Sequence, residues 1–165
     1  RPYLQANGFI SCASDEQGIP SENRLCLADN KPISGLELKK IIGLYQERLK
    51  KLSEISELAD FFFKDKLDFP KELLRWKDLN DEEIKDSLNA SMKILDNIEE
   101  TSWTKEKLTD ILLKEAEKIG DRGKLLWPLR AALSGKKASA GPFEIAELLG
   151  KEKTINRLKV AIEKL

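Results

Sequence analysis

The chain has 165 residues, of which 41% are hydrophobic and 35% are charged, a composition suited to a buried core beneath amphipathic helices. It contains no histidine, which excludes the Ser-His-Asp and Cys-His catalytic sets, and it has no Walker-type or dinucleotide-binding glycine loop. No hydrophobic run approaches the ~18 residues of a membrane-spanning helix. The start lacks both a methionine and an apolar signal segment, which indicates a fragment or a processed product.

Two cysteines, Cys12 and Cys26, are the only thiols. They do not form a Cys-x-x-Cys pair, and no histidine is present to complete a zinc site, so we expect neither a metal nor a cofactor in this segment. Reduced thiols in a cytosolic protein are favoured, although a disulfide between the two cysteines remains an alternative.

The charges balance overall but are unevenly distributed. Residues 1–103 carry 15 basic and 20 acidic side chains, whereas residues 104–165 carry 14 basic and 9 acidic ones. Between Arg122 and Phe143 there are five basic residues and no acidic one. A local basic patch of this kind is what contacts with nucleic-acid phosphates require. The change of sign near Trp103 predicts a boundary between two subdomains.

In chain order, residues 1–34 are interrupted by Gly and Pro and are expected to form loops. Ser34 and Glu37 then form a capping-box pattern that begins a helix. A second helical segment is predicted over 55–63, and Pro70 opens a short helix that ends at Trp76. Asn80 and Thr104 are N-cap residues for two longer helices. The inward-facing hydrophobic residues predict these two helices and three later ones at residues 80–98, 104–120, 125–133, 142–150 and 154–165.

Because no long alternating strand pattern occurs, the predicted class is all-α. Five stretches in this helical part resemble the motifs of glutamyl-tRNA synthetases, in the same order along the chain. The most specific is LWPLRAALSG at residues 126–135, which is similar to the family signature M-P-L-R-[AV]-A-[LV]-T-G. The others are ERLKKLSE at 47–54, SWT at 102–104, FEIAELLGKE at 143–152 and the closing helix at 155–165.

The resemblance implies an α-helical cage that grips the anticodon loop of tRNA-Glu. It implies a junction to a catalytic domain at residues 1–34 and two helical subdomains at 35–103 and 104–165. It also implies that this segment is not an enzyme, because ATP and Mg would bind in the catalytic domain of the parent glutamate–tRNA ligase. The expected setting is a cytoplasmic monomer with no membrane contact.

The same resemblance assigns the binding residues. Arg130 corresponds to the family arginine that lies against the anticodon, and Arg48 to the position that senses the first anticodon base. Without the family match, an ion pair would be the better explanation of Arg130 and a solvated helix face that of Arg48. The remaining candidates are Trp127, the surface lysines Lys136 and Lys137, and the loop residues Ser139, Ala140 and Pro142. Without the resemblance, Trp127 would be expected in the hydrophobic core.

Two other functions are compatible with parts of the sequence. Amphipathic helices of mixed charge are also typical of protein-interaction domains without any role in RNA binding. A free-standing enzyme is disfavoured, because histidine and the nucleotide-binding loops are absent and no carboxylate pair stands out.

Overall fold

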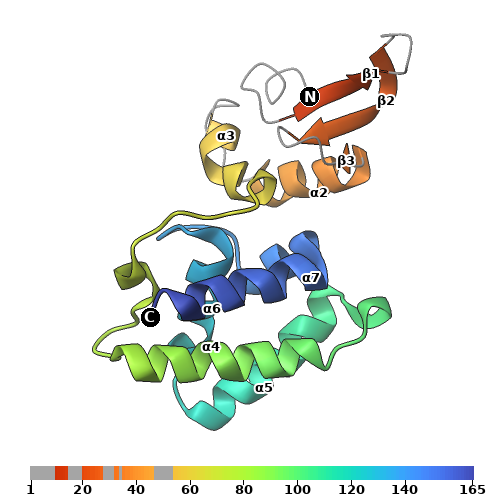
Figure 1. Ribbon diagram of the computed structural model, residues 1–165. Helices are drawn as coiled ribbons and strands as arrows, with labels where there is room; N and C mark the ends of the chain where they lie inside the picture. Colours follow the sequence, from red (N-terminus) through yellow and green to blue (C-terminus); the bar gives the residue numbers. More distant parts are fainter. Residues whose placement is uncertain (1–9, 15–19, 28–31, 34, 47–53) are drawn as a thin grey trace. The chain divides into compact units, whose positions relative to one another are not determined.

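The computed structural model describes residues 10–14, 20–27, 32–33, 35–46 and 54–165. These residues belong to two compact units, an N-terminal unit of Arg1–Lys64 and a C-terminal unit of Asp65–Leu165 (Figure 1). Arg48 and the surrounding residues 47–53 lie outside the described residues, so the role predicted for Arg48 stays a prediction.

The first described elements of the N-terminal unit are the strands β1 (Ile10–Ser14), β2 (Pro20–Leu27) and β3 (Pro32–Ile33). They form an antiparallel sheet in the order β1-β2-β3. The sequence predicted loops here, because Gly and Pro interrupt residues 1–34 and no long alternating strand pattern occurs. Pairing between separate segments stabilises them as strands, and the local pattern does not reveal that pairing. The register sets Cys12 opposite Leu25 and Cys26 opposite Ser11, so the two cysteines are not cross-strand partners.

The helical elements described in the N-terminal unit are α2 (Gly35–Tyr45), α3 (Glu54–Ala59) and the 3-10 helix η2 (Asp60–Phe63). The predicted inward face of α2 is confirmed by Leu38, Ile41 and Tyr45, which are all buried. The helix α2 packs against α3, and α3 packs against η2. The described residues of this helical part therefore form the helices that the apolar periodicity predicts.

The C-terminal unit is helical throughout. Its elements are η3 (Lys71–Leu74), α4 (Asp81–Asp96), η4 (Glu100–Ser102), α5 (Lys105–Ile119), α6 (Arg122–Ser134) and α7 (Pro142–Glu163). The helix α6 contacts α4, α5, α7 and η3, which places it at the centre of the unit. Its Leu125, Leu129 and Leu133 are completely buried. The helical class predicted from the sequence is confirmed, and no described helix is long and apolar enough to cross a membrane.

The structure divides the chain at a different place from the predicted one. We expected a boundary between residues 103 and 104, but the two units separate between Lys64 and Asp65. Helix α4 packs against α6 and α7, and the indole Nε1 of Trp103 donates a hydrogen bond of 2.9 Å to the carbonyl of Ala146. The residues on both sides of Trp103 therefore belong to one hydrophobic core, although the surface charge changes there. Solvent-exposed charges do not show which hydrophobic faces pack together.

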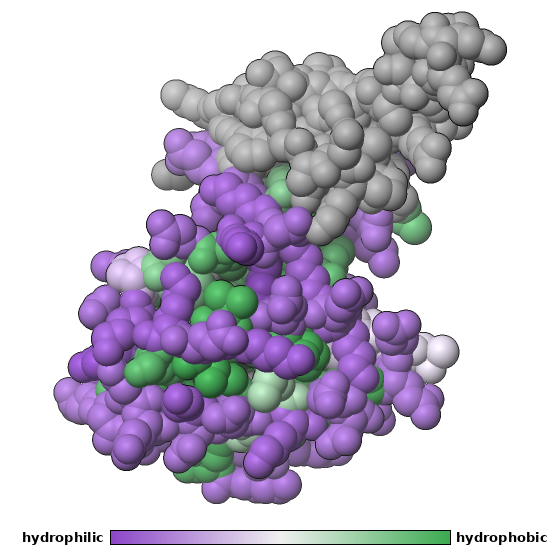
Figure 2. Space-filling view, viewed as in Figure 1, coloured by the Kyte–Doolittle hydropathy of each residue, from purple (hydrophilic) through white to green (hydrophobic). Residues whose placement is uncertain are grey.

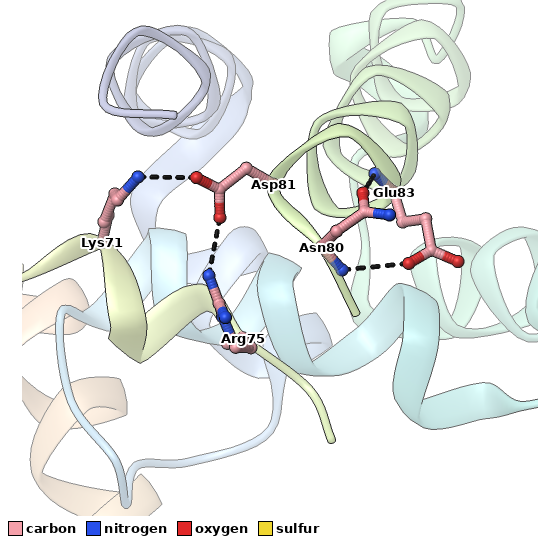
Figure 3. A network of polar contacts seen from close by, with 5 residues as sticks. All are labelled: Lys71, Arg75, Asn80, Asp81 and Glu83. Atoms are coloured by element: carbon pink, nitrogen blue, oxygen red, sulfur yellow. Dashed lines mark hydrogen bonds and ion pairs between the residues drawn. The ribbon is translucent and has the colours of Figure 1, made fainter. Parts of the chain in front are cut away.

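The start of α4 has the N-cap residue that the sequence predicts, and the structure shows that Asn80 is part of a capping box. The side chain of Asn80 accepts a hydrogen bond of 2.9 Å from the backbone N–H of Glu83, whose carboxylate accepts one of 2.9 Å from the N–H of Asn80 (Figure 3). In the same view, Asp81 binds Lys71 at 2.6 Å and Arg75 at 2.8 Å. The hydrogen bond from Lys71 lowers the pKa of Asp81. Because the folded-state pKa is depressed, this contribution to stability is present above the ordinary pKa and is lost as the pH falls.

Replacing Asn80 with alanine should lower the free energy of unfolding by about 1 kcal/mol, because the N–H of Glu83 loses its acceptor. Urea denaturation followed by circular dichroism measures this change. The substitution Asn80→Asp retains a capping oxygen and should leave stability nearly unchanged. An equal loss in both variants would show that the cap contributes nothing.

A second prediction concerns two serines one helical turn apart on α4. The hydroxyl of Ser91 is buried without a hydrogen-bond partner, whereas that of Ser87 donates a 2.7 Å bond to the carbonyl of Lys124. Because a buried unpaired hydroxyl costs free energy, Ser91→Ala should raise the free energy of unfolding by about 1 kcal/mol. Ser87→Ala should lower it by about the same amount. Thermal melts of the two variants that shift in the same direction would contradict this assignment.

The helix α7 bends where the sequence predicts a helix end. Gly150 has φ 75° and ψ 167°, outside the helical region, so two helical segments meet there. The next residue, Lys151, donates from Nζ to the carbonyls of Asp96 at 2.7 Å and Ile98 at 2.9 Å. Carbonyls at a helix C-terminus lack partners within the helix, and a cation there is favourable. Lys151 therefore stabilises the end of α4. This contact explains in structural terms why a lysine stands at this position of the FEIAELLGKE stretch.

Candidate functional site

The basic stretch identified in the sequence is built around helix α6. Asp121 caps its start, because its carboxylate accepts a 2.8 Å hydrogen bond from the N–H of Gly123. The pKa of Asp121 is lowered, first by the hydrogen bond from Lys77 and then by that from Gly123. The helix ends at Gly135, whose φ of 65° is readily adopted only by glycine. The segment 135–141 then leads into α7.

Arg130 lies in the last turns of α6 and is only partly exposed. Its guanidinium carbon lies 4.5 Å from the ring centroid of Trp127, within the range of a cation–π contact. Its Nη2 donates a 2.9 Å hydrogen bond to the carbonyl of Lys137. The guanidinium thus has a fixed place between an aromatic ring and the segment after the helix. The ring of Trp127 and the carbonyl of Lys137 are thus two of the groups that hold Arg130.

Trp127 is half-buried and is held at several points. Its indole Nε1 donates a 3.1 Å hydrogen bond to the carbonyl of Leu73 in η3. Its ring centroid lies 5.2 Å from that of Trp76, with the planes tilted by 38°. Such offset aromatic pairs stabilise a protein beyond the area they bury. The ring that supports Arg130 is therefore itself fixed by η3 and by Trp76.

Trp76 continues this arrangement, although sequence reasoning did not select it. The ammonium of Lys77 lies 5.2 Å from the Trp76 centroid and 3.1 Å from the carboxylate of Asp121. The indole Nε1 of Trp76 is 3.4 Å from the same carboxylate. Four side chains thus contact one another in sequence, each touching the next: Lys77, Trp76, Trp127 and Arg130. We call them the cation–aromatic stack. A tryptophan at the end of a predicted short helix gave no signal of this arrangement, since Trp127 and Asp121 lie far along the chain.

The segment after α6 carries the other candidates. Lys136 is half-buried, and its N–H donates a 3.2 Å hydrogen bond to the hydroxyl of Ser134. Lys137 is exposed, and Ser139 donates a 3.1 Å hydrogen bond to the carbonyl of Ala140. Ala140 and Pro142 are buried, so neither residue offers an exposed side chain to a ligand. The structure thus gathers Trp127, Arg130 and the two lysines around one end of α6.

Arg157 is a buried residue that the motif comparison did not select as functional. It is 5% exposed, and its Nη1 donates a hydrogen bond to the carbonyl of Leu133 in the last turn of α6. Burial lowers its pKa to about 10, an effect that Asp65 opposes, so the guanidinium remains charged at neutral pH. The sequence placed Arg157 in the closing helix at 155–165 and gave it no separate role. The bond to Leu133 instead fixes the turn from which Arg130 and Lys137 project.

The face of the C-terminal unit seen in Figure 2 fits a polar ligand better than an apolar one. Figure 2 shows a mostly hydrophilic face in which hydrophobic residues lie in gaps between charged and polar ones. Within the part of the chain that the structure describes, no group of three or more acidic, cysteine or histidine side chains could hold a metal ion. The arrangement around α6 can donate hydrogen bonds and offer positive charge.

Comparisons with known proteins agree with this geometry. A family model described as an anticodon binding domain matches residues 21–162. The chain is 39% identical over 134 residues to a glutamate–tRNA ligase of Clostridium acetobutylicum, covering 79% of this chain and 27% of the relative. It is 40% identical to that of Clostridium tetani, with 78% and 27% covered. The chain thus spans about a quarter of the length of the curated relatives it matches.

A solved structure gives the same result in three dimensions. The crystal structure of a glutamate–tRNA ligase from Elizabethkingia meningosepticum matches with a TM-score of 0.70 at 27% identity, covering 83% of this chain and 26% of the other. The resemblance predicted from the five motifs is confirmed by sequence and by fold. The chain belongs to the family of anticodon-binding domains that form part of glutamate–tRNA ligases.

Proposed function

We propose that this chain binds the anticodon loop of tRNA-Glu as the recognition part of a cytoplasmic, monomeric glutamate–tRNA ligase. In this proposal the ligation of glutamate, with ATP and Mg, takes place on a catalytic domain outside this chain. The observation that carries the proposal is the guanidinium of Arg130, held between the ring of Trp127 and the carbonyl of Lys137. The family relationship supplies the ligand class.

Physical chemistry supports a role for Arg130 in reading RNA. Proteins recognise single-stranded RNA loops by hydrogen bonds to splayed bases and by stacking on aromatic or guanidinium planes. A guanidinium donates hydrogen bonds in a planar fork and stays charged at any physiological pH. Because Trp127 and Lys137 fix its place before RNA arrives, less side-chain freedom is lost on binding.

The lysines after α6 suit contacts with the phosphates. Lys137 is exposed and adjoins Lys136, and the stretch from Arg122 to Phe143 contains five basic residues and no acidic one. Phosphate contacts release counterions and make affinity depend on salt. We therefore assign orientation of the loop to Lys136 and Lys137, and base recognition to Arg130 with the backbone of residues 139–142.

Replacing Arg130 with alanine should weaken binding to a tRNA-Glu anticodon stem-loop by about 1–3 kcal/mol, the range for a good base contact. Fluorescence anisotropy with a labelled stem-loop measures the affinity, and circular dichroism measures helix content, which should not change. Unfolding of Arg130→Ala would make Arg130 a structural residue and would contradict its role in binding.

The same assay separates RNA binding from a protein-interaction role. Lys137→Gln should lower the slope of log affinity against log salt by roughly one, the value for one lost phosphate contact. A matched control is Lys114→Gln on α5, an exposed lysine that pairs with Asp110, which should leave the slope unchanged. Equal affinity for the tRNA-Glu stem-loop and an unrelated hairpin would favour a helical protein-interaction domain.

A further inference from the structure

We propose that Trp76 is a positioning residue for RNA recognition, acting on Arg130 through Trp127. The inference rests on the proposed function, because Arg130 is the group that it positions. It follows from the cation–aromatic stack, in which Trp76 is the member that joins the segment before α4 to the face of α6. Trp76 itself is not assigned a contact with RNA.

The first step of the argument is that Trp76 has one position. A Cβ atom added at Gly123 would lie 2.2 Å from Cε2 of the Trp76 ring, so the ring lies directly against the backbone at the start of α6. The carboxylate of Asp121 is 3.4 Å from its Nε1, and Lys77 approaches its ring from 5.2 Å. Lys77 has φ 51°, a left-handed conformation that is uncommon for residues other than glycine. Tertiary contacts therefore fix this part of the stack.

The second step is that Trp76 restricts Trp127. The two ring centroids are 5.2 Å apart, and the indole Nε1 of Trp127 donates its hydrogen bond to the carbonyl of Leu73, three residues before Trp76. The segment that carries Leu73 and Trp76 thus holds Trp127 both by its ring and by its N–H group. A smaller residue at position 76 would leave a gap beside the Trp127 ring, which could then turn about its side-chain torsions.

The third step connects the ring to the guanidinium. Arg130 lies 4.5 Å from the Trp127 centroid, and the attraction of a cation to an aromatic face depends on the orientation of that face. A Trp127 ring that turns therefore presents less of its face to Arg130. The guanidinium would then occupy several positions before binding, and ordering it would lower the affinity for RNA.

A double-mutant cycle tests the proposal with the full 165-residue chain and the anticodon stem-loop of tRNA-Glu. We expect Trp76→Leu to weaken binding by about fivefold, as for the loss of a contact of cation–π strength. In the Arg130→Ala background, Trp76→Leu should cause no further loss. Trp76→Phe retains an aromatic ring and should restore most of the affinity. Thermal melts confirm that each variant is folded at the assay temperature. If Trp76→Leu does not fold, the affinity of Trp76→Phe is compared with and without Arg130 instead.

A matched control is Trp103→Leu, since Trp103 is bonded to Ala146 and lies outside the stack; it should leave the affinity unchanged. An equal loss from Trp76→Leu with and without Arg130 would overturn the positioning role. Normal affinity of Trp76→Leu while Arg130→Ala binds weakly would also overturn it, and would leave the proposed function intact. Normal affinity of Arg130→Ala itself would contradict the proposed function.

Discussion

Gly123→Ala should lower the free energy of unfolding by about 1–3 kcal/mol, the cost of forcing extra atoms into a packed site. The new methyl group would lie 2.2–2.5 Å from three atoms of the Trp76 ring, which Asp121 and Trp127 hold in place. Alanine is the better helix former by about 1 kcal/mol, so a net loss would mean that the clash outweighs this gain. Urea denaturation measures the effect. Displacement of Trp76 should also weaken binding to the anticodon stem-loop.

A matched control is available in α2. Gly43 is exposed within that helix, and a Cβ atom there would meet nothing within 4 Å. Gly43→Ala should therefore raise stability by about 0.5–1 kcal/mol through helix propensity alone. If Gly123→Ala were as stabilising as Gly43→Ala, the Trp76 ring would not be fixed, and the positioning of Arg130 through Trp76 would lose its support.

Arg157→Ala should lower the free energy of unfolding by about 3 kcal/mol. The carbonyl of Leu133 would lose its partner, and a buried unpaired polar group costs about 1–3 kcal/mol. Loss of the buried aliphatic part of the side chain adds a packing cost. The last turn of α6 should also loosen, and with it the place of Lys137 and Arg130. Chemical denaturation measures the stability, and amide hydrogen exchange at Gly135 reports on the turn.

Two variants show whether the effect comes from this bond. Arg157→Lys keeps a cationic donor and should recover part of the stability. Arg122→Ala removes an arginine of similar size that is 61% exposed and paired with Glu117, and surface pairs of this kind contribute at most about 1 kcal/mol. Equal losses of stability in Arg157→Ala and Arg122→Ala would show that the bond from Arg157 to Leu133 does not stabilise the last turn of α6.

Much of the helical fold could be predicted because its signals are local. Asn80 and Thr104 begin α4 and α5 as caps, as the sequence indicated, and Gly120 and Gly135 end α5 and α6 in the left-handed region. The sheet was missed because its stability depends on pairing between β1, β2 and β3. The boundary between the units was misplaced because surface charge was read in place of core packing.

The residues of the candidate site likewise fall into those that the sequence predicted and those that it did not. The motif around α6 led to Trp127, Arg130 and the lysines, and the structure brings these together. Trp76 and Arg157 were not selected, because their partners are 51 and 24 residues away along the chain. A lone tryptophan in a short helix or an arginine in an amphipathic one gives no local sign of such contacts. Only the packing of η3 and α7 on α6 reveals them.

The central claim can be tested most directly through the side-chain N–H groups of the three tryptophans. Each gives its own signal in a nitrogen–proton NMR spectrum, and Trp76, Trp103 and Trp127 are assigned by single substitutions. Titration with the tRNA-Glu anticodon stem-loop should move the Trp127 signal most, since its ring contacts Arg130, and should leave Trp103 in place. A stem-loop with a scrambled anticodon should move Trp127 far less. A shift of Trp103 alone, or identical shifts with both RNAs, would contradict anticodon recognition by the end of α6.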